Sequence, residues 1–385
     1  ATTEIYTLSL HDALPISRLV KMKIGKKFLS LLMGVAVLLV SSLPAFAAEV
    51  ETTDCASVSY DYVTEFDDGG KDYVYIIDGV KNHYLVPPDD FDPLTATDEE
   101  LDRYCFPDRP EAMALSDAAN SDYSDWYSLM ANYTGTPEPE ISVSVQPVNP
   151  EPTAPVTRAT SATSYNWSGY VSDLGDSSSK FYTQAQVDYT QPTISAIESG
   201  AVTLNSYWIG FGGYNGSEKL VQAGTSTYGK STHKAWYEYL SDTGESVYMQ
   251  YIDSLTVSAG DSIHVYITFQ KANNKFEYYI ANNTTGKSAS GYVELDASKQ
   301  FDGTTVEWVV ERCKSGGSLT SLGDYGTMTM KNCKATLNSS NTWLNLGNLS
   351  NLYKVTMIGY GGNTLSSPGS ISSGTQFTCT FKDYS

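Results

Sequence analysis

Two glutamates in the strand-like run VEWVVE are the residues best placed for acid–base chemistry. Alternate residues of a strand point to opposite faces, so Glu307 and Glu311 share one face and Val306, Trp308 and Val310 share the other. We therefore expect the apolar face to pack against a core and both acids to point into a solvated cleft. A carboxylate there can take a proton from water and return it to a leaving group.

Other common catalytic chemistries have little support in the sequence. Beyond residue 47 the only histidines are His83, His233 and His264, and no Cys/His spacing typical of a zinc site occurs. The strand–turn–helix motif GxSxG of many serine hydrolases is missing as well. We expect neither a metal nor another cofactor.

A pair of carboxylates also fits a glycoside hydrolase of the jelly-roll type. Such enzymes hold the two groups roughly 5–5.5 Å or 6.5–9.5 Å apart. Glu307 and Glu311 lie four positions apart, or about 13 Å on a regular strand. A bulge could shorten that distance, or Glu238 could supply the second acid, so this alternative stays open.

The elements that position these residues are short strands. Between residues 161 and 385, runs rich in Tyr, Val, Ile, Thr and Trp alternate with Gly, Asn, Ser and Asp clusters, without a helical period of useful length. Clear examples are Ser206–Phe211, His233–Tyr239, Ser262–Gln270 and Lys275–Ile280, and the residues Asn282–Gly286 suit a hairpin connection. The pattern predicts an all-β domain, either an antiparallel sandwich or a barrel.

Several phrases of this domain resemble the glutamic peptidases, or eqolisins. They occur in the family order and cover most of residues 161–335: Asn166–Gly169, Trp208–Gly210, Leu220–Gly224, Ala235–Tyr239, Gly260–Ile263, Asn283–Gly286, Val306–Glu311 and Asp324–Thr329. The resemblance implies a concanavalin-like or jelly-roll-like β-sandwich of two bent antiparallel sheets, with the active site on a concave face. It also implies an endopeptidase that acts on proteins or peptides.

The resemblance also implies the catalytic pair. Carried over by motif, the pair is Gln222 in LVQAG and Glu311 in VEWVVE. A carboxylate near a bound water can act as general base and then as general acid, while a carboxamide N–H can stabilise the developing oxyanion. Without the resemblance, Gln222 would read as an ordinary surface glutamine.

The remaining candidates would line the cleft or support the pair. Tryptophans are more often core residues than ligand contacts, but the resemblance places Trp167, Trp208 and Trp236 at the cleft. Glu238, sixteen residues after Gln222, matches another acid of the family's cleft. Glu307 is expected to be a neighbour of Glu311.

Two positions depart from the fungal members of the family. Where those read WVGIDG, this chain has WIGFGG, so Gly212 replaces an aspartate; where they read QTGVD, it has QAGTS, so Ser226 replaces a second one. Fewer carboxylates around Glu311 should exert less upward pressure on its pKa.

The N-terminal third has a different character. Residues 1–21 resemble an adaptor-derived leader, and residues 22–47 have the basic, apolar and small-residue regions of a signal peptide, so we expect a secreted, extracellular protein. Residues 48–135 are expected to form an acidic propeptide or accessory region, with a helix started by Thr97 and Glu100, and residues 136–160 a Pro-rich linker before the peptidase domain at 161–385.

Charge and cysteine content bound the partners. Residues 49–157 carry a net charge of −20, whereas residues 158–385 carry −3, so no basic surface suits a nucleic acid. After removal of the signal peptide we expect no membrane attachment, and we assume a monomer.

The five cysteines leave their disulfide pairing open. A non-catalytic carbohydrate-binding sandwich, for which the 29 tyrosines are suitable, is a further alternative.

Overall fold

The structure is a computed structural model, and it describes residues 55–110, 117–147, 161–175, 179–214, 219–240, 246–295 and 301–385. The expected leader and signal peptide, and residues 148–160 of the expected linker, lie outside these ranges. The described residues belong to a single compact unit, Val50–Ser385. Within it nearly all regular structure is β-strand, as the sequence predicts.

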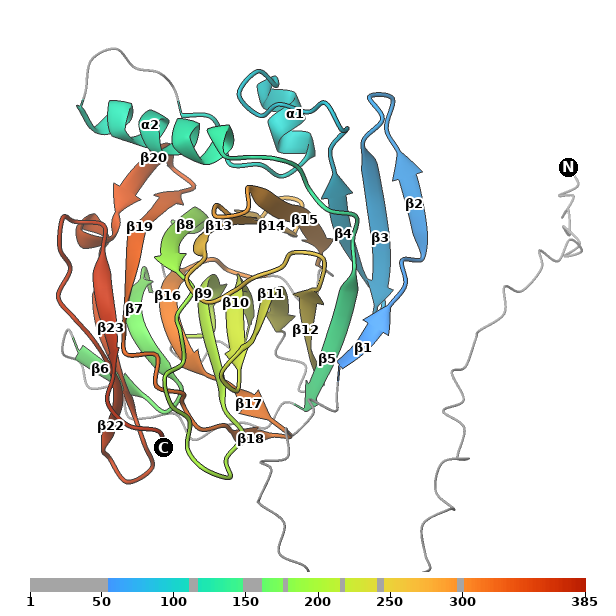
Figure 1. Cartoon of the computed structure of the whole chain (residues 1–385). Coiled ribbons are helices and arrows are strands. Elements are labelled where there is room, and N and C mark those ends of the chain that lie inside the picture. Colours follow the sequence, from blue (N-terminus) through green and yellow to red (C-terminus); the bar gives the residue numbers. More distant parts are fainter. Residues whose placement is uncertain are drawn as a thin grey trace, which may run out of the picture. The chain divides into compact units, whose positions relative to one another are not determined.

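Two antiparallel layers make up the fold (Figure 1). We call them sheet 1 and sheet 2. In order of pairing, the strands of sheet 1 are β21 (Leu352–Ile358), β7 (Trp167–Asp173), β16 (Thr305–Arg312), β9 (Leu204–Gly212), β10 (Leu220–Tyr228), β11 (Thr232–Leu240), β12 (Ser246–Ile252), β5 (Ile141–Pro147) and β1 (Cys55–Val58).

Sheet 2 lies across the core from sheet 1. Its strands, again in order of pairing, are β20 (Ser340–Asn345), β19 (Thr327–Leu337), β8 (Tyr182–Thr190), β13 (Ser262–Gln270), β14 (Lys275–Asn282), β15 (Lys287–Glu294), β4 (Val80–Val86), β3 (Lys71–Ile77) and β2 (Tyr62–Glu65).

The remaining elements connect or cover these layers. Strands β22 (Thr364–Pro368) and β23 (Phe377–Phe381) join β21 to β19, so the hydrogen-bonded network is continuous between the two sheets. The others are β6 (Ser161–Ser164), parallel to β21, the hairpin β17 (Lys314–Ser315) and β18 (Ser318–Leu319), the 3₁₀ turn η2 (Leu346–Asn348), and helices α1 (Asp98–Arg103) and α2 (Asp117–Ala131).

The main hydrophobic core fills the space between the sheets. Strands of sheet 1 contribute every second residue, for example Tyr207, Ile209 and Phe211 from β9, and sheet 2 contributes residues such as Val265 and Ile267 from β13. All five side chains are buried. This alternation is the period-2 pattern from which the strands were predicted, and it leaves the second face of sheet 1 available for a site.

Several elements that local sequence signals predict are present in the structure. All four example strands lie in β9, β11, β13 and β14, and the run Asn282–Gly286 connects β14 to β15. At helix α1 the Thr97 hydroxyl accepts from the Glu100 N–H, and the Glu100 carboxylate accepts from the Thr97 N–H. The predicted capping box is therefore confirmed.

Candidate active site

The second face of sheet 1 gathers the candidate residues. Along the register, Glu311 on β16 is opposite Ser206 on β9, Gly210 on β9 is opposite Gln222 on β10, and Gln222 is opposite Glu238 on β11. Because residues paired across a sheet share a face, these side chains all lie on the side away from the main core. We call it the Glu311 face; it bears Glu311, Trp208, Gln222, Trp236 and Glu238.

Three N–H groups hold the Glu311 carboxylate. Its Oε1 accepts from Asn166 Nδ2 at 2.9 Å and from Trp167 Nε1 at 3.2 Å, and its Oε2 accepts from Trp208 Nε1 at 2.8 Å. The donors come from β9, from the first residue of β7 and from the residue before it, so both sheet neighbours of β16 contribute. Hydrogen bonds to an ionised acceptor are the strong ones, and this set fixes both oxygens of the carboxylate.

Gln222 and Glu238 form a direct pair beside this carboxylate. Gln222 Nε2 donates to Glu238 Oε2, and both side chains are buried. Burial, together with the negative charge of Glu311, raises the pKa of Glu238 to about 8, against the opposing effect of the Gln222 hydrogen bond. A carboxyl group with that pKa is protonated at acidic and neutral pH, so the site combines a buried acid, an amide and a partly exposed carboxylate.

Glu307 differs from the expectation that both acids point into a solvated cleft. It occupies the Glu311 face by register, since its partner Gly210 also faces Gln222, but its exposed fraction is 0%. Burial raises its pKa well above the ordinary value, which favours the neutral form of the acid. Alternation of residues assigns a face correctly, but it does not tell whether that face is covered.

The three tryptophans pack together on the same face. Trp167 and Trp208 are in edge-to-face contact, with ring centroids 5.0 Å apart, and both donate to Glu311. Trp236 is fully buried beside them, and its Nε1 has no hydrogen-bond partner among the described residues. Two of the tryptophans therefore orient the carboxylate, and the third packs in the same hydrophobic cluster.

Both departures from the fungal pattern have a structural counterpart. Gly212 has φ +95°, and a Cβ built on it would lie 2.1 Å from the carbonyl oxygen of Lys219. An aspartate does not fit this backbone, because that oxygen belongs to the main chain and cannot rotate away. Ser226 is buried and pairs with Ser206, so it lies on the Glu311 face two strands from Glu311.

Two residues of the site were not predicted. Asn166 belongs to the phrase NWSG, yet no role was assigned to it, and an amide directly before a cleft tryptophan was the available signal. Cys313 follows β16, donates to Ser206 Oγ at 3.0 Å, and its pKa is raised well above the ordinary value by burial and by Glu311. Nothing in the sequence marked this thiol.

Within the described ranges, no group of three or more His, Cys, Asp and Glu side chains could hold a metal ion. None of the helices there is long and apolar enough to span a bilayer.

Comparison with known proteins gives matches over the same part of the chain. Residues 165–381 match the model of the Peptidase A4 family. Aspergillopepsin-2 of Aspergillus niger is 30% identical over 201 residues, which are 46% of this chain and 66% of that protein. Scytalidopepsin B of Scytalidium lignicola is 26% identical over 128 residues, 32% of this chain and 47% of that protein. The chain thus spans less than two thirds of either relative.

Solved structures show weaker likeness over comparable lengths. Scytalido-glutamic peptidase with a transition state analog inhibitor matches at 20% identity and a TM-score of 0.47, covering 57% of this chain and 98% of that one. Aspergilloglutamic peptidase from Aspergillus niger matches at 26% identity and a TM-score of 0.40, covering 47% and 99%.

Fold and site together define a β-sandwich protein with an acid–amide site on one sheet face. The family match extends over more than half of the chain and includes Glu311, Trp208, Gln222, Trp236 and Glu238. The chain belongs to the Peptidase A4 family, the glutamic peptidases, as the sequence motifs indicated.

Proposed function

We propose that this protein is a secreted glutamic endopeptidase in which Glu311 activates water and Gln222 stabilises the tetrahedral intermediate. The observation that carries the proposal is the placement of Gln222 and Glu311 on one sheet face, with three N–H donors holding the carboxylate. Membership of the Peptidase A4 family supports it independently.

The proposed reaction needs only these side chains and water. Glu311 accepts a proton as the water oxygen attacks the peptide carbonyl carbon, and the carbonyl oxygen becomes an oxyanion. Gln222 Nε2 carries two protons; Glu238 engages one, and the other is assigned to the oxyanion. When the C–N bond breaks, Glu311 returns its proton to the leaving nitrogen, which leaves a carboxylic acid and an amine.

Glu238 acts in this proposal as a positioning residue. Through its hydrogen bond it fixes the rotation of the Gln222 amide, so that the nitrogen rather than the oxygen is held toward Glu238. As a neutral acid it also avoids a second negative charge next to Glu311. Ionisation of Glu238 above about pH 8 would then oppose the negative charge that develops on the substrate oxygen.

Export and oligomeric state remain predictions from the sequence. Residues 22–47 carry the signal-peptide pattern, and we propose that the protein leaves the cell as a monomer without membrane attachment. Expression of the full chain in a secreting host, followed by N-terminal sequencing of the protein in the medium, tests the cut after Ala47. Protein that stays cell-associated with residues 22–47 attached contradicts export.

The catalytic pair is tested by two substitutions and one control. We expect Glu311→Gln to lower the rate of peptide release by about 10²–10⁴-fold and Gln222→Ala by about 10²–10³-fold. Glu140→Gln, at an exposed glutamate outside the site, should leave the rate unchanged. Rates are measured on a denatured protein substrate from acidic to neutral pH, with circular dichroism as the check on folding.

Two outcomes contradict the proposal. If the parent protein releases no peptides at any pH, the glycoside hydrolase and the carbohydrate-binding alternatives become the better explanations. If Glu311→Gln stays active while folded, the general base is another residue.

A further inference from the structure

The N-terminal region, residues 55–147, supplies strands to the same side of both sheets (Figure 1). Strand β4 pairs with β15 of sheet 2 from Ser290–Leu85 to Glu294–Lys81. Strand β5 pairs with β12 of sheet 1 along its whole length, and β1 pairs with β5. Without this region, β12 and β15 would both become open edges with unpaired N–H and C=O groups, a template for aggregation.

The same region completes the main hydrophobic core. Tyr75 and Tyr84, from β3 and β4, are each 1% exposed and belong to the cluster that contains Tyr237 and Tyr278 of the two sheets. Ile141 of β5 belongs to it too. Aromatic side chains bury large areas, so removal of the region would open one end of the core to water.

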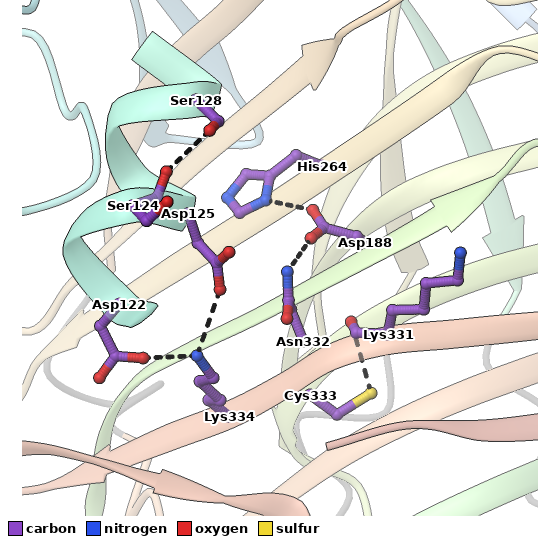
Figure 2. Close-up of polar contacts among 10 residues, drawn as sticks. All are labelled: Asp122, Ser124, Asp125, Ser128, Asp188, His264, Lys331, Asn332, Cys333 and Lys334. Carbon is purple, nitrogen blue, oxygen red and sulfur yellow. Dashed lines mark hydrogen bonds and ion pairs between the residues drawn. The ribbon is translucent and has the colours of Figure 1, made fainter. Parts of the chain in front are cut away.

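Helix α2 is fastened to the outer surface of sheet 2 (Figure 2). Lys334 of β19 is 4% exposed, and its Nζ lies 2.5 Å from Asp122 Oδ1 and 3.6 Å from Asp125 Oδ2, both on α2. The register of β19 shifts between Lys331 and Lys334, which is a bulge of the kind that redirects a side chain. The ion pairs therefore join a buried lysine of the peptidase domain to the acidic region.

Strands β5 and β1 also lengthen the Glu311 face. Across the register, Glu238 is followed by Met249 on β12, Ser144 on β5 and Cys55 on β1. A parallel row runs from Trp236 through Tyr251 and Ser142 to Ser57. In this row Tyr251 and Ser142 are buried and Ser57 is exposed, so the row opens to solvent at β1.

We propose that residues 55–147 are a permanent working part of the enzyme, which extends the substrate-binding face, and not a prosegment that leaves on maturation. This region supplies edge strands, core side chains and two strands of the Glu311 face, so its loss would leave both sheets and the core incomplete. The extension of the substrate-binding face rests on the proposed peptidase function; the permanent association does not.

The first experiment cuts the chain between the two parts. A recognition sequence for a site-specific protease replaces residues 150–157 of the full chain, and the folded protein is nicked and passed over a size-exclusion column. We expect both fragments to elute together at the mass of the uncut protein, to separate only in denaturant, and to keep the peptidase activity. Elution of the C-terminal fragment alone, with equal or higher activity, overturns the proposal.

The association of the two fragments and their peptidase activity are measured independently in this experiment. Co-elution is scored by mass, without any reference to catalysis. If the fragments stay together but neither cut nor uncut protein cleaves peptides, the peptidase proposal fails while the permanent association stands.

A charge reversal tests the contact that Figure 2 shows. We expect Lys334→Glu in the nicked protein to lower the denaturant concentration at which the fragments separate, and the added changes Asp122→Lys and Asp125→Lys to restore part of it. Lys331→Glu is the matched control, because Lys331 lies at the other end of the same bulge and has no ion pair among the described residues. Equal effects of Lys334→Glu and Lys331→Glu contradict a specific role of α2.

The extension of the substrate-binding face is tested by two lysines on β1. Strand β1 lies four strands from β10, which carries Gln222, or about 19 Å, so an extended peptide reaches it roughly six residues from the scissile bond. Ser57→Lys places a cation on the Glu311 face, and Ala56→Lys places one on the opposite face of the same exposed strand. At low salt we expect Ser57→Lys to raise kcat/KM for acidic over basic long peptides by at least about threefold, and Ala56→Lys to leave that ratio unchanged. An equal ratio in both variants refutes the extension.

Discussion

The buried acid Glu238 gives the sharpest prediction about stability. The folded state raises the pKa of this carboxyl from 4.5 to about 8. One pKa unit corresponds to about 1.4 kcal/mol, so ionising Glu238 in the native protein costs roughly 5 kcal/mol more than in the unfolded chain. That is comparable with the whole stability of many domains.

The sign follows from proton binding. Between pH 4.5 and about 8 the native state holds the Glu238 proton while the unfolded state has released it. The contribution of Glu238 to the free energy of unfolding is therefore complete below pH 4.5, falls by about 1.4 kcal/mol per pH unit, and is lost as the pH rises through 8. The titration of Glu238 on its own therefore makes the protein more stable in acid.

The substitution Glu238→Gln removes this titration and keeps the shape of the side chain and an acceptor for Gln222. We expect the free energy of unfolding of the variant, measured in urea, to lack the decrease with pH that Glu238 causes in the parent. The variant should therefore become increasingly more stable than the parent from pH 5 to pH 8. Because all other groups titrate in both proteins, the difference between the two curves isolates Glu238. Parallel curves would refute the raised pKa, and Glu140→Gln, at an exposed position, should give such parallel curves.

Three further predictions concern single contacts. Gly212→Asp should lower the melting temperature strongly, since the Cβ would lie 2.1 Å from the Lys219 carbonyl oxygen; an unchanged melting temperature would contradict this close approach. Trp208→Phe removes the 2.8 Å N–H donor to Glu311 and should lower kcat about 10-fold to 100-fold with little change in KM, measured by steady-state kinetics. Thr97→Ala removes the cap of α1 and should cost about 1 kcal/mol in urea unfolding, with activity retained.

Local patterns were sufficient for much of the fold. The alternation in Ser262–Gln270 gave the bounds of β13, and Thr97 with Glu100 gave the start of α1. Both signals are contained in a few consecutive residues, where period and capping chemistry act directly. The partners of each strand depend on distant residues, and a single sequence carries no comparable signal for them.

Local sequence patterns predicted neither the burial of Glu307 nor the formation of β5. Glu307 alternates like a residue of a wet face, but the packing of neighbouring strands covers it completely. Residues 141–147 read as part of a Pro-rich linker, yet they pair with β12 and β1. Helix α2 was also not predicted, because its polar sequence shows only a weak apolar stripe and its position depends on contacts such as that of Asp122 with Lys334.

Part of the site could also be predicted from the sequence, and part could not. Sheet register brings Gln222, Glu238 and Glu311 to one face. The alternation within each strand predicts which residues of that strand share a face, but not how the strands are paired. The selection of Gln222 came from the family motif alone, since an isolated glutamine carries no spacing signal. The Asn166 donor was overlooked because it lies before the strand that presents Trp167.

The joining of β4 to β15 has a consequence for the order of folding. Leu85 of β4 finds its partner Ser290 only after more than half of the chain has followed it. Pairings between such distant segments form slowly, because a long loop must close before the contact stabilises the chain. While a chain is being synthesised from its N-terminus, β3 and β4 have only each other and β2 to pair with. Like charges repel, so the acidic composition of this region disfavours contact between the waiting strands of different chains.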